Sequence, residues 1–544
     1  MPRSARLTVV QSPVETLMRK LRIGIIDLLT KGPETSMFAR VMAPNFASIM
    51  PQVVAVWCEQ AGHDVSFMCY TGFEDLETDL PSDVDLVFIT SFSVSAQLAY
   101  ALSNWYQSKG ACTVLGGPHA RCYPQDAQKY FDYVLGFCDQ STIDDVLRDC
   151  TPHRPEGVRL QSAKQPAELP GVVERWKFIE PMLRKAPIVK LVPMIGSLGC
   201  PYTCSFCIDS EIPYQPLDFE VLKRDLRFIQ TKMKRPLVGW HDPNFGVRFD
   251  DYLDAIEDAV PNGSIDFIGE SSLSLLTEPH VKRMQKAGFR AILPGVESWY
   301  DMGGKSRTGS NQGIDKVRKV ADHVNMILRH IPYVQTNFVL GLDCDEGPEP
   351  FELTKTFVDL CPGAFPAYSL LTAFGQAAPL NLEYQRAGRV LPHPFFLLNS
   401  HSAMNVIPKN YSWKQFYDQL IDMTRYSFSW RAVGRRFQAN TGILPTGFNL
   451  LRALSNEGTG RVNYYADLRA RLDTDTSLRD YLDGQSTVLP ALYGDRLRES
   501  MGPFYQHLPA GAIEHDQNAY LKSTVIELTP TPAPRTVDDA VGVA

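Results

Sequence analysis

LRIGIIDL, at residues 21–28, is a short apolar run of the kind that forms a strand buried on both faces. A helical pattern follows from about residue 46 to residue 61, Gly62 ends it, and a second apolar run covers residues 65–70. Further apolar runs lie at residues 85–90, 112–115 and 133–135, and a helical stretch covers about residues 96–108. Short apolar strands that alternate with helices predict an α/β domain with a doubly wound parallel sheet over residues 21–150.

A second series of the same kind begins at residue 190. Strand-like runs lie at residues 190–197, 237–241, 265–270, 290–296, 334–340 and 367–372, and helical patterns at residues 219–232, 279–287, 312–329 and 351–360 fit between them. This alternation predicts a partial (β/α)6 TIM-like barrel over residues 188–375. The site of such a barrel is expected at the carboxyl ends of its strands.

The rest of the chain is less regular. Residues 151–187 contain prolines and charges without periodicity, which indicates a linker between the two domains. A mostly helical C-terminal region is predicted over residues 376–527, with one amphipathic packing helix at residues 412–437. The tail at residues 528–544, LTPTPAPRTVDDAVGVA, is Pro-rich and is predicted to be disordered.

Composition excludes several classes of protein. A length of 544 residues favours two or three domains, and a formal net charge of −7 argues against a nucleic-acid partner. The chain has no run of eighteen uninterrupted apolar residues, so no integral membrane segment is expected. Eleven cysteines without a secretion signal fit a reducing compartment, and we expect a cytoplasmic protein.

Three of the eleven cysteines form a motif. Cys200, Cys204 and Cys207 are spaced C-x-x-x-C-x-x-C in a loop with Gly and Pro, directly after the first strand of the predicted barrel. Thiolates are the usual ligands of iron-sulfur clusters, and three of them leave one iron of a cubane cluster open to a substrate. The alternative is zinc, which needs a fourth ligand in a structural site; His241 is a candidate if folding brings it close.

The cysteine motif resembles the signature of the radical S-adenosylmethionine superfamily, in which an aromatic residue precedes the last cysteine, as Phe206 does here. The resemblance implies a 4Fe-4S cluster, S-adenosylmethionine bound to the open iron, and Phe206 close to the adenine. It also implies an external electron donor such as flavodoxin or ferredoxin.

Other segments resemble that superfamily at the expected places. Asp242 lies in a segment like the D-x-x-F segment after the second strand, and Gly295 and Glu297 lie in one like the G-x-E-S segment that helps to hold the cofactor. Lys305 and Arg307 follow, and a cation there would pair with the carboxylate of the methionine part. Asp242 is equally suited to cap a loop, and each cation to be an ordinary surface charge.

The first domain carries a second resemblance. Leu115-Gly116-Gly117-Pro118-His119-Ala120 is similar to the glycine loop of the cobalamin-binding domains that precede many radical S-adenosylmethionine enzymes. The resemblance implies a cobalamin site at Ser91, Gly116, Gly117, Pro118 and His119, with His119 as a supporting residue and not a ligand of cobalt. The chain departs from that pattern in two respects: it lacks D-x-H-x-x-G, and Gly136-Phe137-Cys138 stands where an acidic G-E segment is usual. A sheet domain that has lost its cofactor is the alternative.

Together these features resemble the group that contains class B methyltransferases and the anaerobic magnesium-protoporphyrin ester cyclases. The resemblance implies cobalamin-dependent methylation of an unactivated carbon. The abundant aromatic residues, and not the resemblance, suggest a small, hydrophobic or planar substrate. One alternative is radical oxidation or cyclisation without methyl transfer. Another, from a different class, is a non-catalytic cobalamin or iron-sulfur sensing module.

Overall fold

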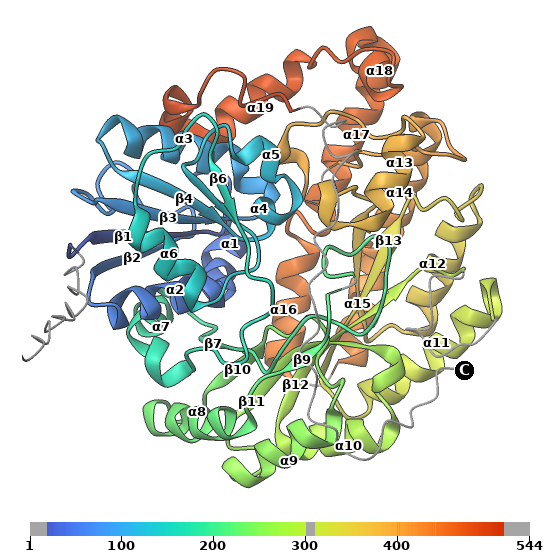
Figure 1. The fold of residues 1–544 in the computed structure, drawn as a ribbon. Helices are drawn as coiled ribbons and strands as arrows, with labels where there is room; N and C mark the ends of the chain where they lie inside the picture. Colours follow the sequence, from blue (N-terminus) through green and yellow to red (C-terminus); the bar gives the residue numbers. More distant parts are fainter. Residues whose placement is uncertain are drawn as a thin grey trace, which may run out of the picture.

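The computed structural model of the 544-residue chain describes residues 19–515, apart from residues 211, 301–310, 400, 402 and 441. Two six-stranded parallel sheets lie side by side in the described part, and a group of C-terminal helices runs across both (Figure 1). The predicted class, parallel α/β with a helical C-terminal region, is confirmed. The predicted tail at residues 528–544 lies outside the described residues.

The first sheet has the strand order β2-β1-β3-β4-β5-β6, and all of its pairs are parallel. Its strands are β1 (Arg22–Leu28), β2 (Asp64–Tyr70), β3 (Leu86–Ser91), β4 (Cys112–Gly116), β5 (Tyr133–Leu135) and β6 (Val158–Leu160). Its helices are α1 (Met37–Met42), η1 (Ala43–Phe46), α2 (Ile49–Gln60), η2 (Ser93–Ser95), α3 (Ala96–Ser108), α4 (Pro118–Cys122), α5 (Pro124–Ala127) and α6 (Gln140–Asp149). The strand order reverses between β1 and β3, so the ligand edge of this sheet is the loops after β1, β3 and β4.

The segment at residues 151–187 is more ordered than its sequence indicates. It contains β6, which pairs with β5, and helix α7 (Val172–Lys185). The three residues of β6 are too few to show a period, and Pro181 interrupts the helical pattern of α7 from within. The segment therefore completes the first sheet and supplies a packing helix in addition to connecting the two sheets.

The second sheet is an open barrel with the strand order β14-β13-β12-β11-β10-β7. Its strands are β7 (Leu191–Met194), β10 (Leu237–Trp240), β11 (Asp266–Ser272), β12 (Phe289–Glu297), β13 (Tyr333–Leu340) and β14 (Phe365–Leu370). The helices between them are α8 (Phe219–Lys232), α9 (Phe249–Ala259), η3 (Leu273–Leu275), α10 (Glu278–Ala287), α11 (Gly313–Leu328) and α12 (Glu349–Leu360). The six predicted strands are confirmed, and their sequential order makes β7 and β14 the two open edges.

The open edge at β7 is covered by side chains from outside the barrel. The Oδ1 atom of Asn45, in η1 of the first domain, accepts a hydrogen bond of 2.9 Å from the Leu191 N–H. Arg175, in α7, donates from Nη2 to the carbonyl of Pro193 at 3.3 Å. Asn45 and Arg175 are both buried, so the first domain and α7 satisfy backbone groups that an exposed edge leaves to water.

The open edge at β14 is covered in the same way by the C-terminal region. Arg436 donates from Nε to the carbonyl of Ala364 at 3.1 Å, and Arg461 donates from Nη1 to the carbonyl of Tyr368 at 2.6 Å. Both guanidinium groups are buried. The barrel is therefore closed by its neighbours on both sides.

The C-terminal region is helical, as predicted. Its helices are η4 (Gly375–Ala377), α13 (Pro379–Arg386), η5 (Phe395–Leu397), α14 (Trp413–Ser427), α15 (Trp430–Ala439), α16 (Ile443–Ala453), α17 (Thr459–Thr474), α18 (Thr476–Leu482), α19 (Ala491–Met501) and η6 (Gly502–His507). The prediction of one helix at residues 412–437 is wrong: the chain breaks after Phe428, because Ser429 caps a second helix by accepting a hydrogen bond from the Ala432 N–H.

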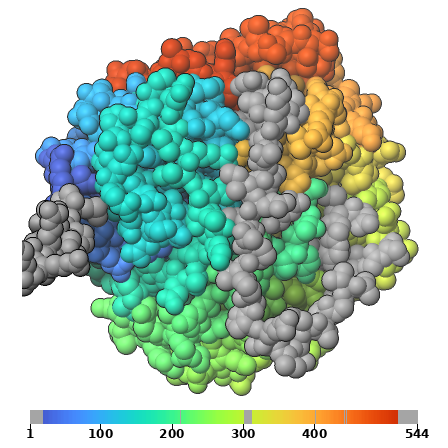
Figure 2. All heavy atoms as spheres, in the orientation of Figure 1, coloured from blue at the N-terminus to red at the C-terminus, as the bar shows by residue number. Residues whose placement is uncertain are grey.

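The end of this region returns to the first domain. Asn104, in α3, donates to the carbonyl of His507 at 3.0 Å, and Trp105 packs beside Phe504. In the space-filling view the last helices, in red, lie directly on the blue first domain, and the green part of the barrel lies below that domain (Figure 2).

Within the described ranges, no single helix is long and apolar enough to cross a membrane. The pair Met37–Phe46 and Ile49–Gln60 satisfies the length and composition only when its two parts, bent by 46°, are taken together.

Candidate functional site

The three motif cysteines lie on one loop at the carboxyl end of β7. A short antiparallel pair, β8 (Ser197–Leu198) with β9 (Gln215–Pro216), closes the base of this loop. Gly199 has φ +67°, and a Cβ atom there would overlap the carbonyl oxygen of Pro213. Only glycine fits this close approach, which lets the Cys200 N–H reach the Ile212 carbonyl at 3.1 Å.

The donor set fits an iron-sulfur cube. All three cysteines are half-buried, and the N–H of Cys207 bonds the carbonyl of Cys204 at 3.0 Å. The Asp209 N–H donates to Cys207 Sγ at 3.4 Å, a hydrogen bond of the kind that stabilises a cluster thiolate. Among the described residues, no group of three or more His, Cys, Asp or Glu side chains, the three cysteines and His241 included, is placed to hold a single metal ion.

Two contacts hold the cysteine loop against the rest of the protein. Phe206 is partly buried against the main hydrophobic core, and the Leu380 N–H, at the start of α13, bonds the Ser205 carbonyl at 2.9 Å. The aromatic residue of the motif therefore lies next to the cysteines with its ring partly inside the protein.

Asp242, after β10, holds the start of the cysteine loop. Its buried carboxylate accepts hydrogen bonds from the Gly196 N–H at 3.0 Å, from Ser197 Oγ at 2.6 Å and from the Tyr252 hydroxyl at 2.5 Å. Burial raises the pKa of this carboxyl above its ordinary value, and the three donors oppose that shift. These contacts suit a residue that positions the loop through its backbone.

We expect Asp242→Asn to destabilise the loop. An amide placed where the carboxylate receives three donors leaves at least one buried donor unmatched, at a cost of about 1–3 kcal/mol. The variant should unfold at a lower temperature than the wild type and retain less iron per chain after anaerobic reconstitution. Asp322→Asn, which changes an exposed carboxylate of α11, is the control and should match the wild type in both measurements. If Asp242→Asn has the wild-type unfolding temperature and iron content, Asp242 does not position the loop.

Gly295 and Glu297 lie together at the carboxyl end of β12. Glu297 has φ +64°, a left-handed conformation that is uncommon for a residue with a side chain. A Cβ atom on Gly295 would overlap Oε1 of Glu297, so the glycine makes room for the carboxylate. The predicted cations Lys305 and Arg307 lie outside the described residues.

The predicted cobalamin residues lie at the ligand edge of the first sheet. Gly117 has φ +90°, and a Cβ atom there would lie 2.8 Å from Cγ2 of Thr90. Gly116, by contrast, has no atom within 4 Å of its Cβ position, so its backbone faces open space at this edge. Pro118 begins α4, and Ser91 is buried with Oγ bonded to the carbonyl of Phe92 at 2.7 Å. The open side of Gly116 is the feature that fits a bulky planar ring.

His119 does not face that space. Its Nε2 lies 2.6 Å from the Tyr100 hydroxyl, its Nδ1 lies 3.4 Å from Ser93 Oγ, and its ring packs on Phe395. Complete burial lowers the pKa of His119 to about 3, so the ring is neutral. The contacts are those of a buried packing residue between the first domain and the C-terminal region.

Helix α4 follows the glycine loop directly and also contacts the cysteine loop, which no sequence pattern indicated. The Tyr123 hydroxyl, one residue beyond α4, donates to the Ala373 carbonyl of the barrel at 3.1 Å. A Cβ atom on Gly375 would overlap the Cys122 carbonyl, so the chain after β14 lies directly against α4. Arg121, also in α4, donates to the carbonyl of Ile208 in the cysteine loop at 2.6 Å. Its only sequence signal is its place beside the glycine loop.

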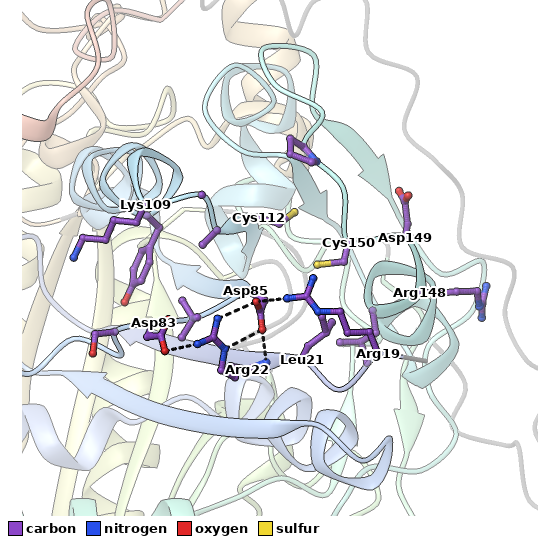
Figure 3. Close-up of a pocket in the computed structure, with 17 residues that line it drawn as sticks. Arg19, Leu21, Arg22, Asp83, Asp85, Lys109, Cys112, Arg148, Asp149 and Cys150 are labelled. Carbon is purple, nitrogen blue, oxygen red and sulfur yellow. Dashed lines mark hydrogen bonds and ion pairs between the residues drawn. The ribbon is translucent and has the colours of Figure 1, made fainter. Parts of the chain in front are cut away.

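A cavity of about 850 Å³ lies elsewhere, at the amino ends of β1, β3 and β4 (Figure 3). Arg22 pairs there with Asp83 and Asp85, and Cys112 and Cys150 line the same wall. Ligands of doubly wound sheets bind at the opposite, carboxyl edge. The cavity is therefore separate from the two predicted cofactor sites.

Residues 194–343 match the model of the Radical SAM superfamily. This match covers the cysteine loop and the barrel strands from β10 to β13. The chain therefore contains a Radical SAM domain over these residues.

Two curated relatives and one solved structure extend the comparison. The chain is 22% identical over 318 residues to bacteriochlorophyllide d C-12(1)-methyltransferase of Chlorobaculum tepidum, covering 57% of this chain and 68% of the relative. It is 22% identical over 371 residues to the C-8(2)-methyltransferase of the same organism, covering 64% of this chain and 79% of the relative. The radical S-adenosylmethionine methyltransferase TsrM of Kitasatospora setae, solved with cobalamin and a [4Fe-4S] cluster bound, superposes with a TM-score of 0.51 at 13% identity, covering 88% of this chain and 99% of TsrM.

Proposed function

We propose that the chain is a cobalamin-dependent radical S-adenosylmethionine enzyme that transfers a methyl group to an unactivated carbon. The observation that carries the proposal is the contact of α4, directly after the first domain's glycine loop, with the cysteine loop of the barrel. With this contact, the two proposed cofactor sites would share one interface. When bound, the cluster and S-adenosylmethionine would supply a carbon radical on the substrate, and cobalamin would supply the methyl group.

In the barrel, Cys200, Cys204 and Cys207 would ligate three irons and leave the fourth for S-adenosylmethionine. Phe206 would pack near the adenine, and Gly295 and Glu297 would line the cofactor site, with Lys305 and Arg307 beyond them. Asp242 would act indirectly, because its carboxylate is engaged by Gly196, Ser197 and Tyr252.

In the first domain, Gly116, Gly117 and Pro118 would form the surface under the corrin ring. The open side of Gly116 supports this role. Ser91 and His119 would shape the loop from behind, because both are buried and hydrogen-bonded within the protein. We divide the chain at residues 187, 375 and 527, as the sequence predicts, and extend the first domain beyond residue 150 to include β6, which pairs with β5.

For substrate, we propose a small hydrophobic molecule. The two curated relatives are named for methylation of bacteriochlorophyllide side chains, and a planar macrocycle of that class is the most direct candidate. The electron donor would be an external flavodoxin or ferredoxin. A cytoplasmic location is part of the proposal, because eleven cysteines, an odd number, suit a reducing compartment better than a disulfide framework.

The test is anaerobic reconstitution of the full chain with iron, sulfide and cobalamin, followed by mass analysis of the adenosine products. Methylation predicts S-adenosylhomocysteine together with 5′-deoxyadenosine. Oxidation or cyclisation without methyl transfer predicts 5′-deoxyadenosine alone. The absence of any cleavage of S-adenosylmethionine by cluster-loaded, reduced protein would favour a sensing module and overturn the proposal.

A further inference from the structure

Arg121 is the side chain that crosses from the first domain to the cysteine loop. It lies in α4, on the side of the domain that meets the barrel, one turn after the glycine loop. Its Nη1 atom lies 2.9 Å from Asp209 Oδ1, and its Nη2 donates to the Ile208 carbonyl at 2.6 Å. The Arg121 and Asp209 side chains are 16% and 27% exposed, so this ion pair is largely shielded from water.

Phe137 packs against the guanidinium of Arg121 where that side chain crosses the interface. The Phe137 ring lies 4.2 Å from Cζ of Arg121 and packs on the face of the guanidinium. An aromatic face holds the cation while leaving its N–H groups free for other partners. An acidic side chain at this position would compete with Asp209 for the same N–H groups.

Asp209 is close to the predicted cluster. It follows Cys207 by two residues, and its own N–H donates to Cys207 Sγ. Reduction adds an electron to a cluster, so an uncompensated carboxylate beside it disfavours reduction and a neighbouring cation offsets that effect. Arg121 is placed to provide this compensation from a different domain.

We propose that Arg121 is a positioning residue that links the cobalamin-side loop to the cluster loop, and that its pairing with Asp209 sets how easily the cluster is reduced. This inference rests on the proposed function, because it requires a cluster on Cys200, Cys204 and Cys207. It makes the reduction potential of the cluster depend on a side chain of the first domain. Disturbing the first domain at α4 then changes the redox behaviour of the barrel.

The experiment compares the full-length wild type with Arg121→Gln, Arg121→Lys, Asp209→Asn and the double variant Arg121→Gln/Asp209→Asn. Each protein is reconstituted anaerobically, and the midpoint potential of its cluster is measured by EPR at a series of poised potentials. Iron and sulfide per chain and the thermal unfolding temperature are measured on the same samples. Arg148→Gln, which removes an exposed cation of α6 on the first domain, is the matched control.

In Arg121→Gln we expect the ratio of reduced to oxidised cluster at a fixed potential to fall by about tenfold, which for a one-electron couple is a shift of about 59 mV to more negative potential. Asp209→Asn should shift the potential in the opposite direction. The double variant and Arg121→Lys should return close to the wild type, since net charge at the pair is restored, and Arg148→Gln should not differ from it.

A second set of variants tests the role of Phe137. Phe137→Glu should lower the midpoint potential in the same direction as Arg121→Gln, because the new carboxylate draws the guanidinium away from Asp209. Phe137→Leu should have a smaller effect, since it adds no charge.

The outcomes separate this inference from the proposed function. If the wild type takes up no cluster, the proposed function fails. If the wild type holds a cluster that cleaves S-adenosylmethionine, but Arg121→Gln with full iron content keeps the wild-type midpoint potential, only the role of Arg121 is overturned. A lower unfolding temperature with an unchanged potential would also overturn it, because it would indicate a purely structural contact.

Discussion

Cys204→Ser should yield a folded protein that holds less iron and sulfide after reconstitution and no longer cleaves S-adenosylmethionine. A serine hydroxyl is a poor substitute for a thiolate ligand, and the two remaining cysteines leave two irons of the cube without protein ligands. Cys204 is half-buried, and its loop is held by backbone hydrogen bonds that do not involve its side chain. The substitution should therefore remove a cluster ligand without unfolding the loop. We expect a loss of cleavage of at least about a thousandfold, of the size seen when a group essential to the chemistry is removed.

Cys150→Ser is the matched control for this experiment. Cys150 is also half-buried, but it lines the cavity at the amino ends of the first sheet, away from the cysteine loop. This variant should keep the wild-type iron content and activity. A fully loaded, active Cys204→Ser protein would contradict the cluster assignment.

Gly116→Leu should abolish methyl transfer and leave the cleavage of S-adenosylmethionine to 5′-deoxyadenosine intact. Because no atom lies within 4 Å of the Cβ position of Gly116, the leucine side chain should be accommodated without unfolding the domain. It would, however, occupy the open space at the ligand edge in which we place the corrin ring. The variant should bind less than about a tenth of the wild-type cobalamin, as expected when a steric clash costs about 1.4 kcal/mol or more.

The products distinguish this effect from a general loss of function. Gly116→Leu should still form 5′-deoxyadenosine, because the cysteine loop is unchanged, whereas methylated product should be lost. Gly434→Leu, at an equally open glycine of α15, should behave as the wild type. Wild-type cobalamin content in Gly116→Leu would place the cofactor elsewhere or remove it from the mechanism.

The sequence was sufficient to predict both sheets because their strands are short, apolar-rich runs that alternate with helical patterns. In β1, for example, every residue from Ile23 to Leu28 is buried. The bounds of α8 match the prediction at residues 219–232, where Asp218 supplies a clear N-cap. The cysteine loop was recognisable because its spacing is local, within eight residues of chain.

The features that the sequence did not reveal depend on contacts between distant residues. The pairing of Arg121 with Asp209 spans 88 positions, and no local pattern marks either residue. His119 was grouped with the cobalamin loop because of its motif, and its contacts with Tyr100 and Phe395, which come from other parts of the chain, are seen only in the structure. The break between α14 and α15 was missed because the apolar face continues across it, while Ser429 acts through a hydrogen bond that periodicity does not detect.

The coverage of the β7 edge by Asn45 and Arg175 has a consequence for modular engineering. A chimera that joins this barrel to the first domain of a relative would lose the acceptor for Leu191 N–H unless the asparagine is transplanted with its loop. A barrel expressed alone would present that strand to other molecules as a template for intermolecular pairing and aggregation. Chimeras of such enzymes should therefore fold better when the barrel keeps the side chains that cover its edge than when the junction is placed at the apparent domain boundary.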